Sequence, residues 1–400
     1  MPSSPEVRSL HVVLTAQCNS RCSYCYQTAK KDRSMDWATL RASIDFAMDS
    51  KAREVELMFI GGEPLLEWPK LCRAVHYAER RLPRGKQVKY AISTNGFLIT
   101  EKIAAFLDKH AFQIQLSFDG IPKAQTYRRR GTFAVIDRLL DRLRQEHADL
   151  FEDRLRVCLT LIPPAIPYLA SSIRYLVGKG VHEIGISPCL TPYPGWTDDC
   201  RAQLDAQLSR VWDISLAHFK RTGEVPLLLL NKANNEKQHR RRVHTMCGVT
   251  NGKELLIDVN GQVHGCALFA DCYQEFPSDF LRKRVDALRM GDFRDPGFWG
   301  RYAAFPGAIR KAEIFHHKEK KYSSYRKCGE CEHLDSCSVC PVSIGYDPKN
   351  TDPHRVPDFL CAFNMLALRY RERFPTMPDP IERLNLFLRG TSRKARSAQG

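Results

Sequence analysis

The chain has 400 residues, of which 43% are hydrophobic and 26% charged, proportions typical of a globular protein. No run approaches the ~18 apolar residues of a membrane helix, and the N-terminus lacks the basic and apolar regions of a signal peptide. We therefore expect a cytoplasmic protein without a membrane span. The net charge of +16 favours an acidic peptide or nucleic acid as partner. However, the basic residues are dispersed and no RNA-recognition signature is present, so we do not expect nucleic acid, and a plain solvated surface is the alternative.

The first half of the chain alternates short β-rich runs with amphipathic helical stretches. Strands are predicted at 11–16, 55–62, 88–96, 113–120, 156–163 and 183–189, with helices at 37–48, 102–110 and 134–145 between them. Apolar strands separated by helices are typical of a parallel sheet with both faces buried. Six such units are too few for a closed eight-stranded barrel, so the pattern predicts an α/β fold, either a partial barrel or a doubly wound sheet. In both, the active site lies at the carboxyl ends of the strands.

The second half has a different organisation. The polar segment 231–246 is predicted to be a linker after a first domain over 1–230. A hairpin follows over 254–267, with Asn260-Gly261 as a type I′ turn signal. Residues 247–370 form a cysteine-rich second domain, and 371–400 are expected to be a helix and a disordered tail.

The 15 cysteines are clustered, and in a reducing compartment clustered cysteines are more often metal ligands than disulfides. Cys18, Cys22 and Cys25 form C-x3-C-x2-C directly after the first strand. Three thiolates on one loop can ligate three irons of a [4Fe–4S] cube and leave the fourth open. The open iron could bind S-adenosylmethionine (SAM) and cleave it, which is chemistry supplied by the cofactor. The alternative, a zinc knuckle, lacks a fourth ligand, since 26–50 contains neither Cys nor His.

This loop, with Tyr24 directly before Cys25, resembles the cluster loop of the radical SAM superfamily. The resemblance implies a partial (β/α)6 TIM-type barrel. It also implies that Gly61, Gly62 and Glu63 meet the SAM amino group, because they match the GGE motif of the family. By the same resemblance, Ser93, Asn95 and Ser117 contact the SAM ribose and carboxylate region, and Arg129 pairs with the SAM carboxylate. The neighbours Arg128 and Arg130 leave that last alignment open.

The later cysteines resemble the SPASM extension of radical SAM enzymes that modify peptides and proteins. They are Cys247, Cys266, Cys328, Cys331, Cys337, Cys340 and Cys361, with Gly261 four residues ahead of Cys266. One departure is that two residues, rather than three, separate Cys337 from Cys340. The resemblance implies two auxiliary [4Fe–4S] clusters, an outer one on Cys328, Cys331, Cys337 and Cys361 and an inner one on Cys247, Cys266 and Cys340.

Two questions about these auxiliary sites stay open. The fourth iron of the inner cluster either stays open for a group of the substrate or is bound by Cys272, His239 or His244. The alternative interpretation of Cys272 is a solvent-facing loop residue. A structural zinc ribbon on Cys328, Cys331, Cys337 and Cys340 is the alternative to the outer cluster.

Two enzyme groups of this architecture fit the chain. Sulfatase maturases, which make formylglycine, carry an Asp base after the cysteine of the G-x4-C motif, where this chain has Ala267, which cannot take a proton. They also carry a cysteine just upstream of the first SPASM cysteine, and none lies between 200 and 247. We therefore predict an enzyme that crosslinks a ribosomally made precursor peptide through a thioether or carbon–carbon bond. Sulfatase maturation and a non-catalytic iron–sulfur electron carrier are the alternatives.

The resemblance also implies partners. Radical SAM enzymes take an electron from a donor such as flavodoxin or ferredoxin. Because the cluster motif begins at residue 18, no N-terminal leader-binding domain is expected. A separate small protein or the surface of the enzyme itself would then recognise the leader of the peptide.

Overall fold

The computed structural model describes residues 6–27, 32–232, 252–270, 272, 279–312, 317–347 and 349–375. Nine strands form one sheet in the order β6-β5-β4-β3-β2-β1-β7-β8-β9. The strands are β1 (Ser9–Thr15), β2 (Glu54–Gly61), β3 (Gln87–Thr94), β4 (Gln113–Ser117), β5 (Leu155–Leu161), β6 (Glu183–Pro188), β7 (Glu254–Ile257), β8 (Gln262–His264) and β9 (Gly291–Asp292). Strands β1 to β6 and β7 run parallel, whereas β8 and β9 pair antiparallel.

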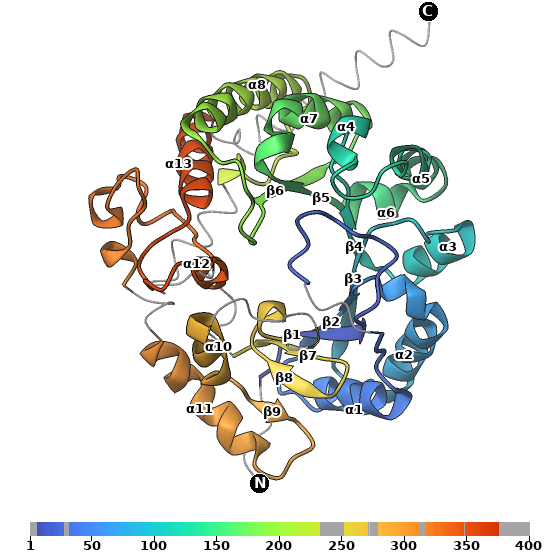
Figure 1. Ribbon diagram of the computed structural model, residues 1–400. Helices are drawn as coiled ribbons and strands as arrows, with labels where there is room; N and C mark the ends of the chain where they lie inside the picture. Colours follow the sequence, from blue (N-terminus) through green and yellow to red (C-terminus); the bar gives the residue numbers. More distant parts are fainter. Residues whose placement is uncertain are drawn as a thin grey trace, which may run out of the picture.

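The sheet curves and carries helices on its outer side, while the segment after β1 lies inside the curve (Figure 1). The helices are α1 (Trp37–Met48), α2 (Trp68–Arg81), α3 (Glu101–Lys109), α4 (Pro122–Gln125), α5 (Phe133–Glu146), α6 (Ala148–Asp153), α7 (Leu169–Gly178), α8 (Asp198–Thr222), α10 (Asp279–Asp286), α11 (Phe298–Lys311), α12 (Pro341–Tyr346) and α13 (Asp358–Arg373). The sheet ends at β6 and β9 without closing. The expected partial barrel is thereby confirmed.

Local sequence explains where these elements begin. The Asp36 carboxylate accepts the backbone N–H of Thr39 at 2.7 Å and thereby caps α1, and the Thr100 hydroxyl accepts the N–H of Ile103 to cap α3. Such caps satisfy amide groups that have no partner within the helix. The six predicted strands and three predicted helices of the first half all occur, with ends shifted by a few residues.

The C-terminal half contacts the barrel on two sides. Strand β7 pairs with β1 from Ser9 opposite Glu254 to Val12 opposite Ile257, so this half extends the sheet rather than building a second one. On the other side α13 packs against α8. There the Tyr370 hydroxyl donates to Asp205 Oδ1 at 2.7 Å.

The predicted hairpin is present, but its predicted turn type is wrong. A type I′ turn needs a positive φ at both Asn260 and Gly261, and only Gly261 has one, at 87°. The Gly261 N–H donates to the Asp258 carbonyl at 3.0 Å. The Asp258 carboxylate accepts the N–H groups of Asn260 and Gln262 at 2.9 and 3.0 Å. These bonds favour a wider loop, a turn followed by a glycine bulge.

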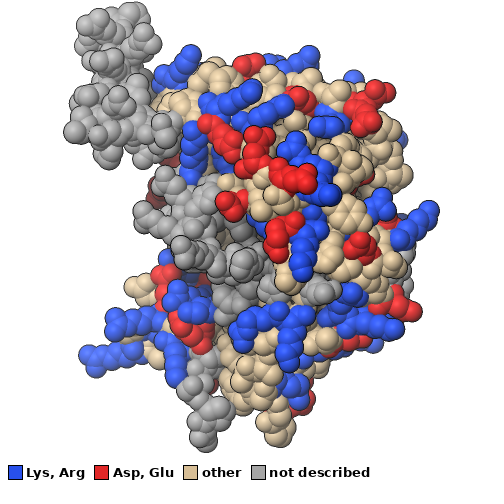
Figure 2. Space-filling model, turned by 90° about the vertical axis from the view of Figure 1, so that its left-hand side faces the viewer, with Lys and Arg blue, Asp and Glu red and all other residues tan. Residues whose placement is uncertain are grey.

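Several predictions concern residues outside the described ranges. They are the linker, most of which falls in 233–251, the ligands Cys247, His239 and His244, and the tail over 376–400. Among the described helices, none combines the length and the apolar character that crossing a membrane requires. Lys and Arg are interspersed with Asp and Glu over much of the described surface in Figure 2, which fits the dispersed basic residues of the sequence.

Candidate functional site

The cysteine loop leaves β1 and passes directly over the carboxyl end of β2. The Gly62 N–H donates to the Thr15 carbonyl, and the Glu63 N–H donates to the Gln17 carbonyl, each at 2.8 Å. A Cβ atom on Gly62 would lie 2.1 Å from the Gln17 carbonyl oxygen, and one on Gly61 would lie 2.5 Å from that of Thr15. The two glycines are therefore required for backbone to approach backbone. In the sequence, the same two glycines had been matched to a motif whose backbone contacts SAM.

Glu63 is a buried carboxyl group at this edge, with 1% of its surface exposed. Its Oε1 accepts the Thr94 hydroxyl at 2.7 Å, and its Oε2 accepts the Asn95 N–H at 2.8 Å. Burial raises the pKa of Glu63 to about 7, although these hydrogen bonds favour the ionised form. The carboxyl can thus gain or lose a proton near neutral pH, and a cationic or N–H donor ligand would favour its ionised form.

Asn95 connects this carboxyl to the cysteine loop. Its side-chain amide donates to the Asn19 side-chain oxygen at 2.7 Å, and Asn19 directly follows Cys18. Ser93 lies in β3, and Ser117 is the last residue of β4, both half-buried. Since β2, β3 and β4 are adjacent and parallel, Glu63, Asn95 and Ser117 lie at the same edge of the sheet.

Tyr24 is held by a buried ion pair that the sequence did not reveal. Its hydroxyl donates to Asp119 Oδ2, and Arg128 Nη2 donates to Asp119 Oδ1 at 2.9 Å. Burial raises the pKa of Tyr24. Burial alone would lower the pKa of Arg128, but the Asp119 charge holds it above the ordinary arginine value. Tyr24 therefore anchors the cysteine loop to Asp119, which lies just beyond the end of β4.

The segment after α4 holds the cysteine loop at two further points. The Ser23 N–H donates to the Tyr127 carbonyl at 2.9 Å, and the exposed Arg129 donates through Nη1 to the Asn19 carbonyl. Arg128 is committed to Asp119, whereas Arg129 lies at the surface beside the loop. This placement distinguishes Arg128 from Arg129, two of the three neighbouring arginines between which the alignment was open.

The donor set of this loop fits an iron–sulfur cluster. Cys18, Cys22 and Cys25 are each partly exposed on one loop. The Ser20 N–H donates to Cys18 Sγ at 3.4 Å, and backbone donors to sulfur are typical of cluster ligands. Three thiols at an accessible sheet edge match a cube with one open iron.

A second group of thiols lies in the C-terminal half. Cys328 is within electrostatic range of Cys331 and Cys361, and Cys337 is within range of all three. Burial raises the pKa of Cys328 to about 11 and that of Cys337 to about 12. The raised pKa keeps both thiols protonated at neutral pH, so a metal that bound here would have to displace their protons. The four are those expected to hold the outer cluster.

The described thiols of the chain are spaced more widely than the ligands of a single zinc ion. Tetrahedral zinc with Zn–S bonds of about 2.3 Å brings its thiols to within about 3.8 Å of one another. Over the described ranges, no three cysteine sulfurs lie within 4.8 Å of one another.

The expected inner site is described only in part. Cys272 has 4% of its surface exposed, so the interpretation as a solvent-facing residue is wrong. Burial raises the pKa of Tyr26 to about 12, and the thiols of Cys25, Cys266 and Cys272 add to this rise. Cys272 and Cys266 therefore both lie near Tyr26, the residue that directly follows Cys25 of the cysteine loop. Cys340 packs against the core at the start of α12.

A cavity of about 240 Å³ lies between the loop that follows β6 and the segment from α12 to α13. Tyr193, Trp196 and Phe359 supply its aromatic walls, and Asp347, Arg355 and Asp358 supply charge. The Tyr193 hydroxyl lies 3.4 Å from that of Ser23, between Cys22 and Cys25. The cavity thus adjoins the cysteine loop.

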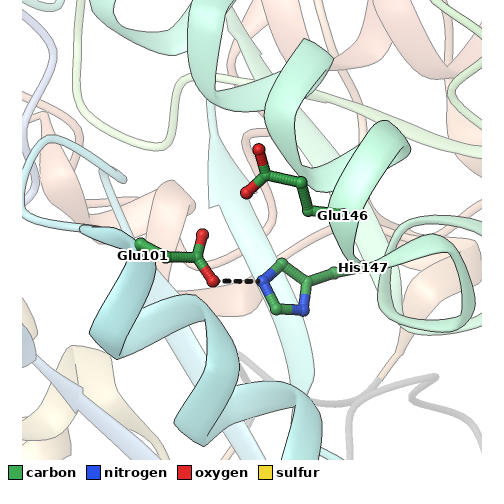
Figure 3. A group of neighbouring side chains, drawn as sticks. All are labelled: Glu101, Glu146 and His147. Carbon is green, nitrogen blue, oxygen red and sulfur yellow. Dashed lines mark hydrogen bonds and ion pairs between the residues drawn. The ribbon is translucent and has the colours of Figure 1, made fainter.

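Figure 3 shows the one compact group of potential metal ligands in the described part of the chain, Glu101, Glu146 and His147. His147 Nε2 lies 3.1 Å from Glu101, and Nδ1 lies 2.9 Å from Asp108. Since both ring nitrogens face carboxylates, this is an ion-pair network that joins α3 to the end of α5.

Sequence reasoning missed Asn19, Asp119, Tyr193 and Trp196. Asp119 stands at the end of the strand predicted over 113–120 and directly before a glycine, which is a usable signal for a strand-end polar residue. Its partner Tyr24 is distant in sequence, and its partner Arg128 is one of three consecutive arginines. Only the folded chain therefore identifies the two partners.

Comparison with known proteins agrees with this geometry. Residues 12–160 match the family model of the radical SAM superfamily. A serine-type anaerobic sulfatase-maturating enzyme from Klebsiella aerogenes is 31% identical over 285 residues, which cover 66% of this chain and 69% of that protein. Two further relatives, both 28% identical, match over shorter stretches, so that the chain spans 60% and 31% of their lengths.

Solved structures resemble the fold over most of the chain. The structure of native anSMEcpe, with bound AdoMet and a Kp18Cys peptide, has a TM-score of 0.70 at 17% identity, and the match covers 90% of this chain and 96% of that one. SuiB of Streptococcus suis, bound to the precursor peptide SuiA, has a TM-score of 0.56 at 16% identity and covers 90% of this chain and 76% of its own.

Proposed function

Because the chain belongs to the radical SAM superfamily, we propose that it is a radical SAM/SPASM maturase of a ribosomally made precursor peptide. It would abstract hydrogen from the peptide and leave a thioether or carbon–carbon crosslink. The observation that carries this proposal is the cavity beside the cysteine loop, where Tyr193 reaches Ser23. We assign residues 1–230 to the SAM-cleaving unit and 247–370 to the auxiliary unit.

The cysteine loop and the strand edge would share the binding of cofactor. A [4Fe–4S] cluster held by Cys18, Cys22 and Cys25 would supply the electron that splits SAM into methionine and a 5′-deoxyadenosyl radical. Glu63 would accept N–H bonds from the SAM amino group, since it is a buried acceptor at this edge. Asn95, Ser93 and Ser117 would contact the rest of SAM.

Arg129 would pair with the SAM carboxylate. Its guanidinium reaches the Asn19 carbonyl and remains exposed beside the loop, whereas Arg128 is buried against Asp119. Arg128 would position Tyr24, and through Tyr24 the cluster loop. Replacing Arg128 should therefore disturb cluster assembly, whereas replacing Arg129 should weaken SAM binding alone.

The auxiliary unit would hold two further clusters. Cys328, Cys331, Cys337 and Cys361 would ligate the outer one, and Cys247, Cys266 and Cys340 the inner one. Cys272 is buried, and both Cys272 and Cys266 lie near Tyr26. This favours Cys272 as the fourth inner ligand over an open position.

The cavity beside the loop would take a side chain of the peptide. Its aromatic walls suit an apolar or aromatic group, and Asp347, Arg355 and Asp358 suit a neighbouring polar or charged group. A flavodoxin or ferredoxin would donate electrons, and a separate protein could present the leader of the peptide.

Sulfatase maturation is the second candidate, because the 31% identical relative is a sulfatase-maturating enzyme. Ala267 at the expected base position and the lack of a cysteine between 200 and 247 favour peptide crosslinking instead. Both reactions remove two hydrogens when serine is the residue oxidised to formylglycine, so the mass change alone does not separate them.

The experiment is anaerobic incubation of the reconstituted enzyme with SAM and either the peptide encoded by a neighbouring reading frame or a sulfatase-derived peptide. Fragmentation that skips the residues between two linked positions would support crosslinking. An aldehyde captured by a hydrazide reagent on the sulfatase peptide would support formylglycine formation and contradict our assignment.

A further inference from the structure

The outer thiol group is surrounded by side-chain donors that the proposed function does not use. The Ser323 hydroxyl donates to Cys361 Sγ at 3.1 Å, and Arg326 Nη1 donates to Cys331 Sγ at 3.6 Å. The Asn364 amide donates to Cys337 Sγ at 3.7 Å. Three of the four thiols thus receive a hydrogen bond from a side chain that is not a ligand.

Cations gather around the same sulfurs. Lys318 is within electrostatic range of Cys328, Cys331 and Cys337, and the buried Lys321 acts on Cys328. Over the described ranges, no carboxylate forms an ion pair with Arg326 or Lys318. Asp335 near Lys318 and Asp358 near Cys361 offset part of this charge.

The cysteine loop with Cys18, Cys22 and Cys25 has different charges around it from the outer thiols. Arg128 acts on Cys22, but its guanidinium is bound to Asp119 at 2.9 Å, and both groups are buried. The pair presents little net charge to the cysteine loop. The other arginines of this loop, Arg21 within it and Arg129 beside it, are exposed, so solvent screens their charge. Arg326 and Lys318 beside the outer thiols are partly buried, so their charge is screened less.

Hydrogen bonds to sulfur and nearby net charge are two of the main determinants of cluster potential. A cube with four thiolate ligands is already negative, and reduction adds one more negative charge. N–H and O–H donors and unpaired cations therefore stabilise the reduced form more than the oxidised form.

We propose that Arg326, Lys318 and Ser323 raise the reduction potential of the outer cluster above that of the radical SAM cluster. These are tuning residues, since they contact ligand sulfurs and neither SAM nor peptide. The inference rests on the proposed function, which supplies the clusters. Its consequence is that the outer cluster is reduced first when electrons are added.

The test is a redox titration of the anaerobically reconstituted full chain, followed by electron paramagnetic resonance. The outer signal is the one that Cys361→Ala removes. Arg326→Gln should lower the midpoint potential of the outer cluster by about 59 mV, which for one electron is a tenfold change in the reduction equilibrium. Lys318→Gln and Ser323→Ala should shift the midpoint in the same direction, Ser323→Ala by less. The control Lys327→Gln, exposed and 3.9 Å from Glu330, should leave it unchanged.

An outer midpoint that stays fixed in both Arg326→Gln and Ser323→Ala overturns the inference, as does an outer cluster that is reduced only after the radical SAM cluster. If Arg326→Gln loses the cluster, the smaller Ser323→Ala change decides. Wild-type protein with no iron beyond one cube contradicts the auxiliary clusters of the proposed function, and the inference with them.

Discussion

Glu63 gives a pH-dependent prediction about SAM binding. Its pKa of about 7 lies well above the ordinary 4.5. At 1.36 kcal/mol per pKa unit, the folded protein is more stable by about 3 kcal/mol when Glu63 is protonated than when it is ionised. Because the folded pKa is raised, SAM-free protein loses this stability as pH rises from about 4.5 to about 7. A SAM amino group beside the carboxyl would restore the ionised form. Binding then requires loss of the Glu63 proton below pH 7, and SAM affinity attributable to Glu63 should rise about tenfold from pH 6 to pH 8.

The assay is calorimetric titration of SAM into reconstituted wild-type and Glu63→Gln protein across this pH range. The ratio of the two Kd values cancels the titration of SAM itself, and iron content checks that the variant keeps its cluster. We expect the ratio of variant Kd to wild-type Kd to grow about tenfold from pH 6 to pH 8. A ratio independent of pH would refute the argument that Glu63 binds the amino group.

Three further predictions follow from individual contacts. Gly62→Ala would place its Cβ 2.1 Å from the Gln17 carbonyl oxygen, so it should cost about 3 kcal/mol and lose the cluster, measured by thermal unfolding and iron content; Gly178→Ala, in open space, should do neither. The His147 pKa is raised because Asp108 and Glu101 outweigh the opposing effect of burial, so its contribution is complete below pH 6.5 and is lost as pH rises through the folded pKa. His147→Gln should accordingly lower Tm more at pH 6 than at pH 9, and an equal loss at both would contradict the ion pair. Finally, Cys272→Ala should change the spectrum of the reduced inner cluster whether or not peptide is present, whereas a spectrum that responds only to peptide would indicate an open position.

Much of the fold was predictable because its elements are marked locally. The alternation of apolar strands with amphipathic helices predicts the parallel sheet. The six strands were found close to their predicted positions because buried parallel strands need long apolar runs. The cysteine loop is predictable from spacing alone, since a cube needs several thiolates from one short segment.

Other features depend on residues that meet only in the folded chain. Tyr24 and Asp119 are 95 positions apart in sequence, and Tyr193 reaches Ser23 from 170 positions away. The turn at Asn260-Gly261 was misjudged because the dipeptide suits two turn types, and the Asp258 side chain selects the wider one. Glu63 was identified from its motif, but its raised pKa comes from burial, which no motif reveals.

Cleavage of SAM is the most direct test of the central claim. Reduced, anaerobically reconstituted wild-type enzyme should convert SAM to methionine and 5′-deoxyadenosine, measured by liquid chromatography. The triple substitution Cys18→Ala, Cys22→Ala and Cys25→Ala should abolish this product while the auxiliary iron remains. Wild-type rates of 5′-deoxyadenosine formation by the triple variant would contradict the account.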